Sequence, residues 1–238
     1  KDRIFNSRVV GVDETGARVG GSKHWFWTWQ NEKLTYIAHS QNRAIATVKK
    51  EFPDGLPNST IVRDGWRAQA ATTAVHHQLC TAHLQRRLNY LNEKYNNATW
   101  GREFSKLLSS ALELGKKERG TKIYNVERTK TVRKMEHLLK YPPDKKQKEL
   151  YAFYKSMGRE QQNLLTFLFI ENVPPDNNGS ERAVRNIKVK QKISGQFKID
   201  KTAQNFAQIR SVIDTTIKNG LNVLDALNLI AKLEVQKQ

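Results

Sequence analysis

Two short apolar segments, each followed directly by an aspartate, constrain the fold of this chain more than any other feature of its sequence. Segment 8–12 (RVVGV) leads into Asp13, and segment 60–63 (TIVR) leads into Asp64. Short runs rich in β-branched residues are typical of buried strands. If the two strands are neighbours in one sheet, their aspartates meet at the same edge. We therefore expect the first strand to end at Asp13 and the fourth to end at Asp64.

The segments around these strands predict a mixed α/β sheet. Segment 15–21 (TGARVGG) has the composition of a turn, and segment 25–29 (WFWTW) has the period-two pattern of a strand. We interpret its three tryptophans as core beneath a helix rather than as a base-stacking platform. Residues 34–38 predict a third strand, 44–52 a helix, 65–74 a short helix and 75–80 a fifth strand. The order of three strands, helix, strand, helix and strand is that of an RNase H-like core with the first strand central.

The pattern changes completely after residue 81. Leucines recur at helical spacing up to about residue 170, and strand signals vanish. We expect a core in two parts, 1–83 and 173–238, separated by an all-helical insertion at 84–172. The second part begins with a basic helix from about Ser180 that ends in a turn at Ser194 and Gly195. Two C-terminal helices, at about 202–218 and 222–235, follow.

The charge of the chain favours a polyanionic partner. It carries 41 Lys and Arg against 23 Asp and Glu, a net charge of +18. Such a surplus raises the local concentration of nucleic acid and speeds its encounter; a ribosomal-type or merely basic protein is the alternative. No apolar run approaches the roughly 20 residues of a membrane span. The single cysteine, Cys80, excludes an intrachain disulfide and fits a reducing cytoplasm.

A third carboxylate, Glu181, follows the break at 173–179 (VPPDNNG). Asn, Gly and Ser are good helix-capping residues, so Glu181 falls in the first helical turn, where it could merely complement the helix dipole. Helical spacing also puts it on one face with three cations, while an apolar set suited to packing on a sheet lies on another face. The cations are Arg185, Lys188 and Lys192, and the apolar set is Ala183, Val184 and Ile187.

Six motifs together resemble the DDE transposases of the insertion-sequence-66 type. They are segments 12–16 (VDETG), 62–66 (VRDGW), 80–83 (CTAH), 176–182 (DNNGSER) and 189–195 (VKQKISG), with the later 206–211 (FAQIRS). The resemblance implies an RNase H-like fold, a helical insertion before the glutamate, and two Mg²⁺ or Mn²⁺ ions. It also implies that Asp13, Asp64 and Glu181 are both the catalytic residues and the metal ligands. The family's N-terminal region for recognising DNA ends is not in this sequence, so the resemblance does not imply specificity for particular transposon ends.

Further candidate site residues have competing interpretations. We expect DNA contacts from the basic helix and from Trp66, although Trp66 is also suited to packing at a helix start. Cys80 and His83 form a structural motif in which His83 makes hydrogen bonds; a zinc site would need two further ligands. Glu14 points away from Asp13 on a strand, so we do not assign it to catalysis. The DNA-contacting residues of the helix are Arg182, Arg185, Lys188, Lys190 and Lys192.

The sequence as a whole predicts a DNA transposase core that cleaves transposon ends and joins the 3′-OH to target DNA. The alternatives are an RNase H-like nuclease that does not join DNA and a catalytically inactive DNA-binding protein. We expect DNA as the partner, a homodimer on paired ends, accessory transposition proteins, no membrane, and a bacterial cytoplasmic location at the nucleoid.

Overall fold

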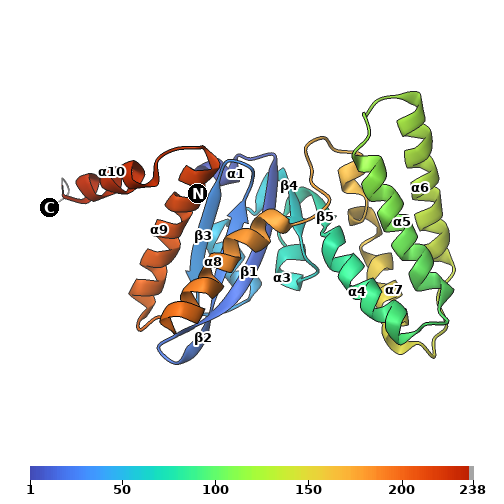
Figure 1. The fold of residues 1–238 in the computed structure, drawn as a ribbon, viewed down its shortest axis with the longest axis horizontal. Helices are drawn as coiled ribbons and strands as arrows, with labels where there is room; N and C mark the ends of the chain where they lie inside the picture. The colour runs from blue at the N-terminus through green and yellow to red at the C-terminus, as the bar shows by residue number, and fades with distance from the viewer. Residues whose placement is uncertain (236–238) are drawn as a thin grey trace. The chain divides into compact units, whose positions relative to one another are not determined.

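The computed structural model describes residues 1–235, which form two compact units. The first unit comprises Lys1–Val75 and Asn177–Gln238, and the second comprises His76–Asp176. The first contains almost all of the sheet, and the second is built mainly from helices (Figure 1). Among the described residues, every helix is too short or too polar to cross a lipid bilayer.

The sheet has five strands in the order β3-β2-β1-β4-β5, so the prediction of a central first strand is confirmed. β1 is antiparallel to β2 and parallel to β4, which makes the sheet mixed and compatible with an RNase H-like core. The boundary between the two units falls inside β5, after Val75. The strands are β1 (Val9–Val19), β2 (Ser22–Gln30), β3 (Thr35–Ser40), β4 (Leu56–Arg63) and β5 (Ala74–Leu79).

The prediction that the first strand ends at Asp13 is wrong. β1 continues through Asp13 to Val19, because residues 15–19 pair with 22–26 of β2 instead of forming a turn. Only Gly20 and Gly21 turn the chain, with φ of 55° and 82°. Two successive positive φ angles match the twist of a tight hairpin, and glycine adopts them without steric cost.

One face of the sheet is covered by α1 (Asp2–Phe5), α2 (Ile45–Glu51) and α3 (Arg67–Ala70). Trp27 and Trp29 of β2 are fully buried there and pack in one cluster with Val48 and Phe52. Trp25 is only partly buried at the edge of this cluster. The interpretation of the tryptophan strand as core beneath a helix is therefore confirmed.

The opposite face carries α8 (Asn178–Ser194) and α9 (Asp200–Lys218); in Figure 1 α8 lies over the strands and α9 lies beside β3. Ala183 and Ile187 of α8 are buried, as the apolar spacing predicted, while Val184 is half-buried. Gly195, with φ of 66°, ends α8 at the predicted turn. α10 (Val223–Val235) completes the unit. The apolar cluster on this face comprises Ala17, Val19, Phe26, Ile37, Ile187, Phe197, Ala203 and Ala207.

The second unit has no strand after β5, as the leucine spacing predicted for this part of the chain. Aromatic side chains fill its interior: Trp100 stacks on Phe104 at 4.9 Å between ring centroids, and Phe153 meets both rings edge-on. Its helices are α4 (Thr81–Lys94), α5 (Thr99–Gly115), α6 (Lys122–Lys140) and α7 (Lys148–Arg159), with short 3₁₀ turns at Gln161–Asn163 and Thr166–Leu168.

The start of α8 approaches β1 very closely at Gly11. A Cβ at this position would lie 2.6 Å from Ser180 Oγ, 2.7 Å from Gln30 Nε2 and 2.8 Å from Asn177 Oδ1. Such distances are far below van der Waals contact, and three polar groups, two at the start of α8 and one at the end of β2, would have to move together. Glycine is therefore required here by space and not by backbone conformation.

We expect Gly11→Ala to lower the free energy of unfolding by about 1–3 kcal/mol, because the added methyl group overpacks the contact between α8 and β1. Urea denaturation followed by circular dichroism measures the change. Gly65→Ala is the matched control, since no atom lies within 4 Å of its Cβ position. An equal loss of stability in both variants would contradict the steric argument.

Candidate active site

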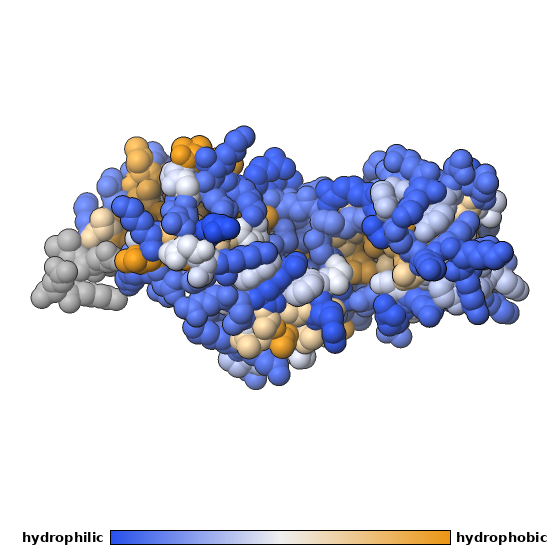
Figure 2. All heavy atoms as spheres, turned by 90° about the horizontal axis from the view of Figure 1, so that it is seen from below, coloured by the Kyte–Doolittle hydropathy of each residue, from blue (hydrophilic) through white to orange (hydrophobic). Residues whose placement is uncertain are grey.

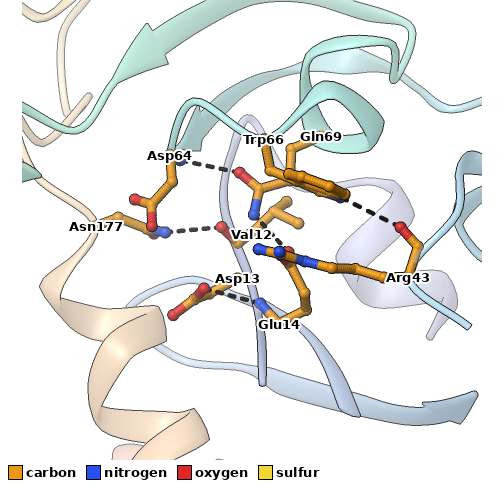
Figure 3. A network of polar contacts seen from close by, with 8 residues as sticks. All are labelled: Val12, Asp13, Glu14, Arg43, Asp64, Trp66, Gln69 and Asn177. Carbon is orange, nitrogen blue, oxygen red and sulfur yellow. Dashed lines mark hydrogen bonds and ion pairs between the residues drawn. The ribbon is translucent and has the colours of Figure 1, made fainter. Parts of the chain in front are cut away.

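Asp13 and Asp64 follow the last paired residues of two adjacent parallel strands. The register of β1 and β4 ends at the pair Val12 and Arg63, so each aspartate is the next residue along its strand. In Figure 3 both carboxylates point to the side of β1 on which Asn177 lies. Asp13 Oδ1 accepts a hydrogen bond of 2.8 Å from the backbone N–H of Glu14. The neighbouring strands thus present two carboxylates side by side.

Gln69 of α3 fixes the position of Asp64 and was not predicted from the sequence. Its side-chain Oε1 accepts from the backbone N–H of Asp64 at 2.9 Å, and its Nε2 donates to Glu14 Oε2 at 2.6 Å. Gln69 is 1% exposed, so these bonds are shielded from water. The end of β4 is thereby tied to β1 through a buried amide.

Glu14 lies on the opposite side of β1 from Asp13, as predicted (Figure 3). Its carboxylate accepts from Arg43 Nε at 2.7 Å and forms an ion pair with Arg43 Nη2 at 2.6 Å. The Arg43 guanidinium lies over the ring of Trp66 at 3.8 Å and over that of Trp25 at 4.8 Å. A buried acid in an apolar strand requires such a partner. In the sequence, this network is indicated only by the acidic Glu14 within a mostly apolar strand.

The first turn of α8 is anchored beside Asp13. Asn177 Nδ2 donates to the backbone carbonyl of Val12 at 2.7 Å, and the backbone N–H of Glu181 donates to the carbonyl of Asn177 at 3.1 Å. Ser180 is fully buried. Glu181 is half-buried in the first turn of α8. The start of this helix is held to β1 by the hydrogen bond from Asn177 to Val12, the residue before Asp13. The sequence motif contains Asn177, but its anchoring role could not be inferred from the motif.

A half-buried lysine, Lys218, supports the start of α8 through Gln30. Lys218 Nζ, at the end of α9, donates to Gln30 Oε1 at 2.7 Å and to the carbonyls of Asn31 and Leu34 at 2.6 and 3.0 Å. Burial lowers the pKa of Lys218 to about 8. The Gln30 side chain that it holds lies against the Cβ positions of both Gly11 and Gly179. Lys218 thus links the end of α9 to the base of α8.

The predicted DNA-contacting cations lie along α8, and two of them contact the protein itself. Lys188 Nζ donates to the carbonyl of Gly16 in β1, and Lys190 Nζ lies 3.9 Å above the ring of Phe197. Arg182, Arg185 and Lys192 are exposed. The face seen in Figure 2 is mostly hydrophilic, in keeping with the net charge of +18. DNA contact by these residues stays a prediction.

The remaining predicted site residues have clear places in the fold. Trp66 precedes α3 and is 36% exposed, and its Nε1 donates to the carbonyl of Arg43 at 3.2 Å, so it packs at a helix start. Cys80 is buried directly before α4, and His83 lies in the first turn of that helix. The neighbouring Thr81 donates through both N–H and Oγ to the carbonyl of Pro175, each at 2.9 Å.

A mixed sheet with aspartates at the ends of two adjacent parallel strands is compatible with an RNase H-like core. The model of the Transposase IS66 family matches residues 1–205, and the chain belongs to that family. No curated protein matches the chain. Membership supports a transposase-type function with DNA as the partner, and DDE transposases in general use divalent metal ions.

We expect Arg43→Met to lower the free energy of unfolding by about 2–3 kcal/mol, because it leaves the carboxylate of Glu14 buried without its cation. The Glu14 side chain is only 1% exposed, whereas that of Arg43 is 36% exposed. The double variant Glu14→Gln/Arg43→Met removes the charge as well and should recover part of the loss. Chemical denaturation of the three proteins measures this coupling. A double variant less stable than Arg43→Met alone would show that the ion pair is not the cause.

Proposed function

We propose that this chain is the catalytic core of a DNA transposase that cleaves phosphodiester bonds at transposon ends and joins the released 3′-OH to target DNA. The parallel register that ends at Val12 and Arg63 carries this proposal, because it brings Asp13 and Asp64 to the same edge of the sheet. The bond from Asn177 to Val12 supports Glu181 as the third carboxylate of the same site.

The donor set fits hard divalent cations. Asp13, Asp64 and Glu181 offer only carboxylate oxygens, which suit Mg²⁺ or Mn²⁺ better than softer metals. These three residues would hold two ions, which when bound supply activation of the attacking oxygen and stabilisation of the leaving oxygen. Gln69 and Asn177 hold the backbone at Asp64 and at Val12 through hydrogen bonds.

One site can perform both reactions, because hydrolysis and strand transfer are phosphoryl transfers that differ only in the nucleophile. In the first reaction water attacks the phosphodiester at the transposon end, and in the second the 3′-OH attacks target DNA. A nuclease that does not join DNA would perform the first alone, and an inactive DNA-binding protein would perform neither. An assay that separates cleaved from joined products distinguishes the three.

The assembly that we propose is a homodimer on paired DNA ends, because one site processes one end at a time and transposition needs two ends. Residues 84–172 act as an insertion in the RNase H-like core and offer a basic surface to DNA or to a partner. The cations of α8, with Trp66 beside Asp64, contact the DNA without reading its sequence. Accessory proteins and a location at the bacterial nucleoid fit this function.

We expect Asp13→Asn, Asp64→Asn and Glu181→Gln each to abolish both cleavage and joining while leaving DNA binding largely intact. Each change removes a metal-binding charge and preserves the size of the side chain. Gel assays with labelled transposon-end DNA in Mg²⁺ measure cleavage and joining, and fluorescence anisotropy measures binding. Glu32→Gln, an exposed acid in the turn between β2 and β3, is the matched control. Near-normal strand transfer by any of the three variants would remove that residue from the proposed site.

We expect Lys188→Ala to weaken binding to all DNA sequences alike and to lower the slope of log K against log salt by roughly one unit. Lys188 is exposed on the helix that carries Glu181, so it is placed to meet phosphates and not base edges. Lys49→Ala is the control, because α2 lies on the other face of the sheet. A loss confined to one DNA sequence would indicate base readout instead.

A further inference from the structure

Two histidines and an aspartate in the first unit converge on one point away from the carboxylates described above. His24 Nδ1 lies 2.8 Å from His39 Nε2 and 3.5 Å from Asp200 Oδ1. One ligand atom from each of the three residues lies within 4.8 Å of the other two. The three residues come from β2, β3 and the first turn of α9, so the cluster joins both strands to the helix.

Sheet register brings the two imidazoles to the same face. Phe26 of β2 is paired with His39 of β3, and His24 is two residues before Phe26 on the same strand. Residues two apart on a strand share a face, so His24 and His39 are diagonal neighbours. Phe26 lies in the apolar cluster beneath α9, and α9 begins with Asp200 directly above the histidines.

A single hydrogen bond does not account for both close contacts of His24 Nδ1. His24 Nδ1 faces both a ring nitrogen and a carboxylate oxygen, yet a neutral imidazole carries only one proton, and that proton can be given to only one acceptor. A neutral imidazole is the form that coordinates metals. The His24 side chain is only 10% exposed, which shields its ring from water.

We propose that His24, His39 and Asp200 bind a zinc-type divalent transition metal ion. Two imidazole nitrogens and one carboxylate oxygen suit Zn²⁺, whereas Mg²⁺ prefers oxygen ligands alone. Zn–N bonds of about 2.0–2.1 Å separate neighbouring ligand atoms of a tetrahedron by about 3.3 Å. The distances of 2.8 and 3.5 Å around His24 Nδ1 lie on either side of that value.

The surroundings of Asp200 complete the site. Gln41 Nε2 donates to Asp200 Oδ2 at 2.9 Å, which orients the carboxylate and leaves Oδ1 directed at His24. Such outer hydrogen bonds hold metal ligands in position. The Asp200 side chain is 42% exposed, so water can occupy the fourth position. The ion fastens the start of α9 to the hairpin of β2 and β3, a structural role separate from DNA cleavage.

Zinc binding to the whole chain tests the proposal. Competition with a chromophoric chelator, in millimolar Mg²⁺ to occupy the carboxylates of the proposed active site, measures stoichiometry and affinity. We expect one zinc site in the unmodified protein and none in His39→Ala. Asp200→Asn should weaken binding at least tenfold. A hundredfold excess of free zinc over Kd should raise Tm of the unmodified protein by about 5–10 °C.

The exposed His137→Ala in α6 is the matched control and should keep the full affinity. If circular dichroism shows that His39→Ala is unfolded, long-range ¹H–¹⁵N NMR spectra of the unmodified protein test zinc binding at the histidine rings instead. Zinc should then shift the resonances of His24 Nδ1 and His39 Nε2 and leave those of His137 unchanged. Unaltered zinc affinity in folded His39→Ala and Asp200→Asn, or no shift at the two ring nitrogens, overturns the proposal.

Discussion

The contact between the start of α8 and β1 at Gly11 is the constraint on which the rest of this site depends. Ser180, Gln30 and Asn177 all meet where a side chain on Gly11 would stand, so helix and strand are held at a single distance. The bond from Asn177 to the carbonyl of Val12 sets the helix along the strand, and Lys218 holds Gln30 beneath it. Moving any of these groups moves the first turn of α8, and with it Glu181.

Asp13 and Glu14 are consecutive in β1, and because successive side chains of a strand point to opposite faces, one is available to the proposed active site and the other to the supporting network. Asp13 faces α8, while Glu14 faces the opposite side and is satisfied by Arg43 and Gln69. Gln69 also accepts a hydrogen bond from the backbone N–H of Asp64. Glu14 therefore stabilises the position of Asp64 through Gln69, although it does not contact the proposed active site itself. The guanidinium of Arg43, placed over two tryptophan rings, joins this support to the loop that contains Trp66.

Sequence patterns predicted the strands, the helices and the family, because hydrophobic period and motif order are properties of the chain alone. They placed the end of the first strand wrongly: segment 15–21 contains three glycines, which are typical of a turn, and only pairing with β2 extends the strand to Val19. They did not reveal Gln69, Arg43 or the anchoring role of Asn177, because each acts through a partner far away in sequence. The convergence of His24, His39 and Asp200 likewise depends on strand register and on where α9 begins.

The order of the elements along the chain has a consequence for synthesis on the ribosome. Asp13 and Asp64 are made early, but the whole of His76–Asp176 must be translated before Asn177 and Glu181 leave the ribosome. At ~5–20 residues per second, this delay lasts about 5–20 s. During that interval a nascent chain carries two of its three proposed catalytic carboxylates and has no helix to lay across β1. The proposed site can therefore form only after the whole helical unit has been translated.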